Sequence, residues 1–94
     1  MKIKPNEVEL IGKWNVLNGK ISSDIICERI NWLTEHYLLK MAISKQWGGW
    51  ETLFQDPYDK RYWERTYPQS EMHNGGPPTL RYITTNQAKS KYDI

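Results

Sequence analysis

Residues 50–67 read WETLFQDPYDKRYWERTY, and this stretch decides the fold. Two runs rich in aromatic residues and threonine, 50–55 and 61–67, have the composition of β-strands. Between them, residues 56–60 form a turn signal with proline at its second position. We therefore predict an antiparallel hairpin.

The simplest register of this hairpin places Gln55 opposite Arg61, and Leu53 then lies opposite Trp63. A slip of one residue exchanges the two faces of a strand. A cross-strand pair of Phe54 with Trp63 in the structure would therefore refute this register.

In this register the hairpin has one core face and one face rich in residues that dominate protein interfaces. The expected core face, on which Glu64 is an awkward member, carries Trp50, Thr52, Phe54, Tyr62, Glu64 and Thr66. The other face carries Glu51, Leu53, Gln55, Arg61, Trp63, Arg65 and Tyr67. Trp, Tyr and Arg are enriched at binding hot spots, so the second face is a candidate partner-binding surface. The alternative stays open that its rings pack the core and its charges form a solvated ladder.

The rest of the chain predicts one helix and further strands. Alternation over residues 8–17 indicates a strand, and Asn18-Gly19 is a hairpin signal before a short return strand. Ser23 suits a helix cap, and apolar residues spaced by three and four predict a main helix over about 24–42. A last strand follows at 79–84, and a short C-terminal helix follows that strand. We predict a single α+β domain over 1–94, with an antiparallel sheet of four to five strands packed against the main helix.

Composition excludes several classes of protein. The 94 residues suit one domain, and five Trp, six Tyr and one Phe indicate a small core rich in rings. The net charge of +2 is too mild to indicate nucleic-acid binding by itself. No apolar run is long enough to span a membrane, and the N-terminus lacks the apolar region of a signal peptide, so we expect a cytoplasmic protein.

No set of residues predicts catalysis, a cofactor or a metal. Cys27 is the single cysteine, so an internal disulfide and a cysteine-based zinc site are excluded. His36 falls in the predicted helix, and His73, beside Glu71, has no accompanying nucleophile motif. We therefore predict no enzyme activity, no cofactor and no metal site.

A small module that binds RNA or single-stranded DNA is an alternative function. A stacking platform of rings and arginines would carry it, formed by Arg61, Tyr62, Trp63, Arg65, Tyr67 and Arg81. Carboxylates lie between these residues in the sequence and would repel phosphates. Binding to nucleic acid is therefore not the preferred prediction.

The chain resembles the immunity protein 27 family of bacterial polymorphic-toxin and contact-dependent-inhibition systems. The resemblance covers residues 5–92, and its most specific part runs from 61 to 78. Its motifs are the segments 9–14, 18–20, 27–30, 32–33, 49–53, 56–57, 61–64, 66–73 and 75–78, with Leu80.

This resemblance implies a small α+β protein that binds a cognate toxin domain, the C-terminal part of a secreted effector, and has no chemistry of its own. The candidate toxin-binding residues are the anchors of the second hairpin face and two loop residues: Arg61, Trp63, Arg65, Tyr67, Glu71 and His73. If the 61–78 motif is purely structural, the toxin instead binds the helix face that carries Glu28, Trp32 and Glu35. The sequence makes no prediction of the toxin's activity or of the oligomeric state.

Overall fold

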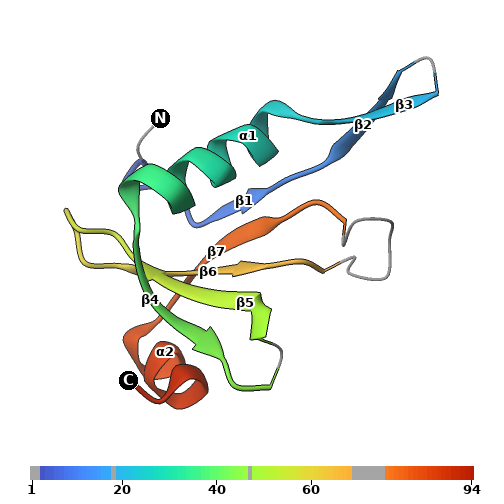
Figure 1. The fold of residues 1–94 in the computed structure, drawn as a ribbon. Helices are drawn as coiled ribbons and strands as arrows, with labels where there is room; N and C mark the ends of the chain where they lie inside the picture. The colour runs from blue at the N-terminus through green and yellow to red at the C-terminus, as the bar shows by residue number, and fades with distance from the viewer. Residues whose placement is uncertain (1–2, 18, 47, 69–75) are drawn as a thin grey trace.

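The computed structural model describes residues 3–17, 19–46, 48–68 and 76–94. Its strands are β1 (Glu9–Ile11), β2 (Trp14–Leu17), β3 (Lys20–Ser23), β4 (Leu39–Ser44), β5 (Gly48–Gln55), β6 (Tyr62–Thr66) and β7 (Thr79–Ile83). Its helices are α1 (Ile25–Trp32), a π-helical turn η1 (Leu33–Tyr37) that continues α1, and α2 (Thr85–Tyr92). Figure 1 shows their arrangement.

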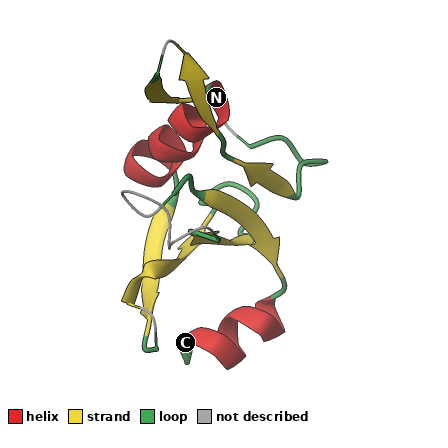
Figure 2. Ribbon diagram, turned by 90° about the vertical axis from the view of Figure 1, so that its right-hand side faces the viewer, coloured by secondary structure: helices red, strands yellow, loops and turns green. Residues whose placement is uncertain are grey.

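Five strands form one antiparallel sheet in the order β1-β7-β6-β5-β4, and β2 and β3 form a separate hairpin. The two helices lie on opposite sides of the five-stranded sheet (Figure 2). Under α1, residues including Ile30, Leu33, Phe54 and Trp63 form the larger core cluster. Under α2, a smaller cluster contains Leu53, Ile83, Ala88 and Tyr92. The predicted α+β class, with an antiparallel sheet, a main helix and a short C-terminal helix, is confirmed.

The main helix is shorter than predicted. It begins at Ile25, after Asp24 rather than Ser23 as its cap, and the Asp24 side chain accepts a hydrogen bond from the Cys27 backbone at 2.8 Å. It ends at Tyr37, whereas the prediction extended it to about residue 42. Residues Leu39–Ser44 form strand β4 instead, because pairing with β5 satisfies their backbone groups.

The first predicted strand is split in two at Gly12. The Gly12 N–H donates to the Pro78 carbonyl at 2.9 Å. The backbone between β1 and β2 therefore lies against Pro78, the residue just before β7. A Cβ at Gly12 would lie 2.6 Å from both the Cys27 Sγ and the Pro78 carbonyl oxygen, so no side chain fits there. The predicted hairpin beyond it is confirmed, since Leu17 pairs with Lys20 and Gly19 has a φ of 78°. Asn18 itself lies outside the described residues.

The predicted register of the β5–β6 hairpin is wrong by one residue. Phe54 pairs with Trp63 and Gln55 pairs with Tyr62. The turn holds one residue more than expected, because Lys60 adopts a left-handed conformation with a φ of 67°. The side chains of β6 therefore exchange faces relative to those of β5, and Trp63 joins Phe54 beneath α1.

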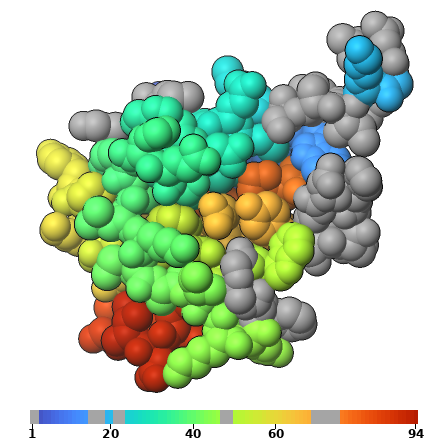
Figure 3. All heavy atoms as spheres, in the orientation of Figure 1, coloured from blue at the N-terminus to red at the C-terminus, as the bar shows by residue number. Residues whose placement is uncertain are grey.

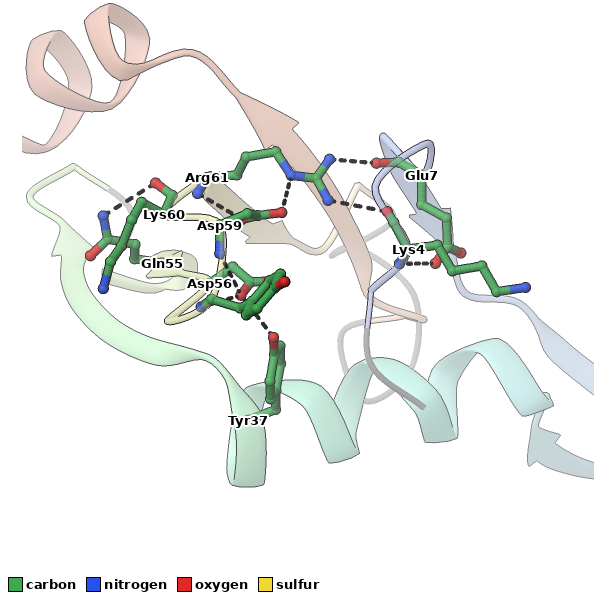
Figure 4. Close-up of polar contacts among 9 residues, drawn as sticks. Lys4, Glu7, Tyr37, Gln55, Asp56, Asp59, Lys60 and Arg61 are labelled. Atoms are coloured by element: carbon green, nitrogen blue, oxygen red, sulfur yellow. Dashed lines mark hydrogen bonds and ion pairs between the residues drawn. The ribbon is translucent and has the colours of Figure 1, made fainter.

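A buried carboxylate organises this longer turn. Asp56, only 1% exposed, accepts hydrogen bonds from the backbone of Tyr58 at 2.8 Å and from the Tyr37 hydroxyl at 2.8 Å (Figure 4). Burial, and then the bond to Asp56, raise the pKa of Tyr37 to about 12. The turn is thereby tied to the end of the main helix, which stabilises the observed register.

Candidate partner-binding surface

Four residues of the hairpin were predicted as exposed anchors: Arg61, Trp63, Arg65 and Tyr67. In the structure they follow the α1 side of β6 instead. Trp63 has no exposed surface and packs in the core cluster with Phe54 and Ile30. A partner would reach this ring only by displacing α1. As an exposed anchor Trp63 is therefore ruled out in this conformation, because the shifted register turns it inward.

The Arg61 side chain is bonded to other parts of this protein. Its guanidinium donates to the Glu7 carbonyl at 2.8 Å and to the Lys4 carbonyl at 3.1 Å, and it pairs with Asp59 at 2.7 Å (Figure 4). Glu7 in turn makes a two-pronged pair with Arg29 at 2.7 Å, which lowers the pKa of Glu7 to about 2. These contacts fix residues 4–7 between the β5–β6 turn and α1.

The far end of the same strand does approach the surface. Tyr67 lies edge-on to Trp50, with ring centroids 5.4 Å apart, and Trp50 is 47% exposed. The half-buried Arg65 lies 5.4 Å from the Phe54 ring and 5.7 Å from the Tyr67 ring. Of the predicted anchors, Tyr67 and Arg65 are therefore placed where a partner can contact them. Glu71 and His73 lie outside the described residues.

The alternative helix face is exposed at its two acidic members. Glu28 and Glu35 are exposed, and the half-buried Trp32 between them stacks on Tyr37 at 6.4 Å. Spacings of four and three residues place all three on one side of the helix. The structure therefore keeps this surface as a second candidate.

A hollow with a volume of about 840 Å³ lies elsewhere, on the α2 side of the sheet. Sequence analysis missed it. Its floor is made by two rows of paired residues that cross the strands: Glu9, Arg81 and Glu64 in one row, and Ile11, Thr79, Thr66 and Glu51 in the other. Its apolar rim is formed by Trp50, Tyr67, Pro68 and Pro77. We call this feature the α2-side hollow.

A buried carboxylate lies in the floor of the α2-side hollow. Glu64 is 2% exposed and accepts a hydrogen bond from the Tyr92 hydroxyl at 2.7 Å. The Lys91 ammonium lies 2.6 Å from the same carboxylate, and the Arg81 guanidinium lies 3.6 Å from it. A buried carboxylate is tolerated only when it is paired and hydrogen-bonded, and α2 supplies two of these three partners.

Lys91 also joins Glu64 to Glu51, whose carboxylate lies 2.8 Å away. Burial acts to lower the pKa of Lys91, but its hydrogen bonds to the two carboxylates outweigh burial and raise it. Burial, and then the bond to Glu64, raise the pKa of Tyr92. Lys91 is thus charged and the Tyr92 hydroxyl protonated at neutral pH, and the network holds α2 against one wall of the hollow.

The sequence contains one signal for this site, the carboxylate of Glu64 on a predicted core face. Its neighbours can be predicted only from the correct register of β6 with β5 and β7. Glu64 was noted as awkward on a core face, and it is indeed buried, on the α2 side. Correct pairing of β6 with β5 and β7 would have placed Glu51, Arg81 and Glu64 together. Lys91 is 27 residues from Glu64 in the chain, and no local pattern connects the two.

A comparison with protein-family models now decides the family. Residues 16–84, well over half of the chain, match the model described as Immunity protein 27. The chain belongs to the immunity protein 27 family. The matched range takes in every strand of the main sheet except β1, together with the whole of α1. Neither a curated protein nor a solved structure gives a match.

Membership of the immunity protein 27 family implies a cognate toxin as partner. In ranges 3–17, 19–46, 48–68 and 76–94, no three His, Cys, Asp or Glu side chains gather as a metal site. None of the described helices has the length and apolar character needed to cross a membrane.

Proposed function

We propose that this protein binds its cognate toxin domain directly and neutralises it by covering a functional surface, without chemistry of its own. The match of residues 16–84 to the immunity protein 27 family carries the proposal. Binding alone is enough for inhibition, since a protein-sized partner can occlude an active site.

The α2-side hollow is the surface we propose for the toxin. It combines two aromatic side chains at the rim, Trp50 and Tyr67, with a charged floor. Aromatic anchors surrounded by contacts that exclude water are the usual composition of a binding hot spot. Tyr67 also belongs to the set of residues expected from the sequence, so the proposal keeps that residue as part of the rim and adds the charged floor on the α2 side of the sheet.

Growth protection tests this function. Cells that express the toxin domain encoded beside this protein should survive when the protein is co-expressed. Trp50→Ala and Tyr67→Ala should each weaken binding by at least tenfold, about 1.4 kcal/mol. Tyr58→Ala is the matched control, because Tyr58 is 88% exposed on the β5–β6 turn, away from the hollow. Growth arrest despite expression of folded wild-type protein would contradict the function.

The helix face remains the competing location for the same function. A double change of Glu28 and Glu35 to lysine reverses its charge at exposed positions and should leave toxin binding unchanged. Loss of binding in this variant, with Trp50→Ala unaffected, would move the toxin to the helix.

A module for RNA or single-stranded DNA is the weaker proposal. Base stacking needs exposed rings, and Trp63, the central ring of that platform, is fully buried. Arg61 is also engaged by the Lys4 and Glu7 carbonyls. Salt-dependent binding to single-stranded RNA would favour this function instead.

A further inference from the structure

The α2-side hollow exists because α2 is short. This helix of eight residues covers Leu53 and Ile83 and leaves open the part of the sheet that carries Thr66 and Thr79. In Figure 3 the red spheres of α2 lie at the lower end of the molecule, and the blue-green spheres of α1 lie above the strands. The open part of the sheet is the floor of the hollow, so the chemistry of that floor decides what the hollow can receive.

The lining of the hollow is locally acidic. Among the described residues, its charged members are three carboxylates and two cations: Glu9, Glu51, Glu64, Arg81 and Lys91. The whole chain has a net charge of +2, so this local excess of negative charge is opposite in sign to the charge of the protein. A partner surface with complementary charge would therefore be basic at this place.

Both cations of the lining are already paired with carboxylates of this protein. The Lys91 ammonium lies 2.6 Å from the Glu64 carboxylate and 2.8 Å from the Glu51 carboxylate. The Arg81 guanidinium lies 3.6 Å from Glu64. An acidic side chain of a partner would have to compete with these carboxylates for either cation.

The carboxylates, in contrast, still have oxygen atoms without a partner. Glu51 binds Lys91 through Oε2, while its buried Oε1 accepts no hydrogen bond. A buried polar atom normally has a partner. The last torsion of a glutamate is soft, so Oε1 can turn toward a donor that enters the hollow. Glu9, which is exposed, forms no ion pair among the described residues.

The position of Glu51 beside the aromatic rim favours an arginine as the donor. Glu51 pairs across the strands with Thr66, the residue before Tyr67, and the neighbouring Trp50 is 47% exposed. A guanidinium stacks on aromatic rings and donates two parallel hydrogen bonds to a carboxylate. A lysine ammonium is a strongly hydrated point charge and makes neither contact as well.

We propose that the toxin domain inserts an arginine side chain into the α2-side hollow, between the Glu51 carboxylate and the rim formed by Trp50 and Tyr67. This inference rests on the proposed function. Glu9 attracts the same basic segment from a greater distance, because β1 and β5 lie three strand spacings, about 14 Å, apart.

The affinities of charge variants test the arginine. The probe is a catalytically inactive form of the toxin domain encoded beside this protein. Glu51→Gln keeps the shape of the side chain, removes its charge and should weaken binding at least tenfold. Glu9→Gln should weaken binding less than Glu51→Gln does. Added salt should weaken the binding of wild type more than that of Glu51→Gln.

Two further variants act as control and counter-test. Asp93→Asn is the matched control, because the Asp93 side chain is 80% exposed just beyond α2 and lies outside the lining; its binding should stay within twofold of wild type. Arg81→Gln removes a cation that repels an incoming arginine, so binding should tighten at least twofold. Thermal unfolding of each variant checks the fold. Weaker binding of a folded Arg81→Gln protein would mean that the toxin brings a carboxylate, and would overturn the proposal.

The toxin side of the contact is tested by changing the arginines of the toxin domain to glutamine, one at a time. One of these changes should cost at least tenfold in affinity for the wild-type protein and less than threefold for Glu51→Gln, because both changes remove the same contact. Lysine at that position should not restore the affinity. Equal losses against both proteins for every arginine would overturn the proposal.

The outcomes separate this proposal from the proposed function. If Glu51→Gln binds like wild type while Trp50→Ala does not, the inserted arginine is overturned and the proposed function stands. If the wild-type protein fails to bind the toxin domain, the proposed function itself fails, and the inserted arginine with it.

Discussion

Glu64→Gln tests whether the charge network in the floor of the hollow stabilises the fold. Glutamine keeps the shape of the side chain but removes the charge that faces Lys91 and Arg81 at 2.6 and 3.6 Å. A hydrogen bond to a charged group contributes ~1.5–3 kcal/mol. Lys91 keeps Glu51, and the Arg81 side chain is 57% exposed, so solvent offsets part of the loss. We expect a net destabilisation of ~2–3 kcal/mol.

For a domain of this size, that loss lowers Tm by ~10–20 °C. Urea unfolding at pH 7, followed by circular dichroism, measures the free energy, and calorimetry gives Tm. Glu51→Gln is the control, because it removes the other partner of Lys91 and leaves the buried carboxylate satisfied; its cost should not exceed ~1 kcal/mol. Equal effects of the two variants, or a Glu64→Gln protein within ~0.5 kcal/mol of wild type, would refute the reasoning.

Three further predictions concern the fold. Gly12→Ala should destabilise the protein by ~1–3 kcal/mol, since the new Cβ would lie 2.6 Å from the Pro78 carbonyl oxygen. Adding Cys27→Ala should not restore the stability of this variant. Full recovery of stability in urea unfolding would show that the clash with the Cys27 sulfur is the only one that matters. The stabilisation from Glu7 is complete above pH ~4.5, where the carboxyl of the unfolded chain is ionised, and it is lost as the pH falls toward 2. The free energy of unfolding should therefore change between pH 7 and pH 3 by ~1–3 kcal/mol more in wild type than in Arg29→Met. Equal pH dependence of the two proteins would contradict the pairing of Glu7 with Arg29. Tyr37→Phe should cost ~1–3 kcal/mol, because it removes a hydrogen bond from the buried Asp56 carboxylate, and an unchanged midpoint in urea would count against the tie between turn and helix.

Local chemistry made much of the fold predictable. The Asn18-Gly19 signal marks a hairpin that the structure contains. The short C-terminal helix is also present as predicted, although its capping box between Thr84 and Gln87 was not identified from the sequence. The end of the main helix was not predictable in this way. Met41 fits the helical stripe, but residues 39, 41 and 43 also fit the alternation of a strand, and pairing with the distant β5 decides between the two.

The candidate site was harder to predict, because it depends on register and on contacts between distant parts of the chain. One left-handed residue, Lys60, moves Trp63 from a predicted surface into the core. A lysine carries no sequence signal for a positive φ, unlike glycine. The sequence pattern predicts that Glu64 lies on a buried face. It does not predict the cations that pair with this carboxylate, because they come from β7 and α2.

Titration of this protein into the active toxin domain tests the central claim most directly. If it neutralises by binding, toxin activity falls linearly and reaches zero at one equivalent, while the mass of the toxin stays unchanged. Full toxin activity at a large excess of folded protein would contradict the claim. Complete loss at a small fraction of an equivalent, with a change in toxin mass, would also contradict it, since that result requires catalysis.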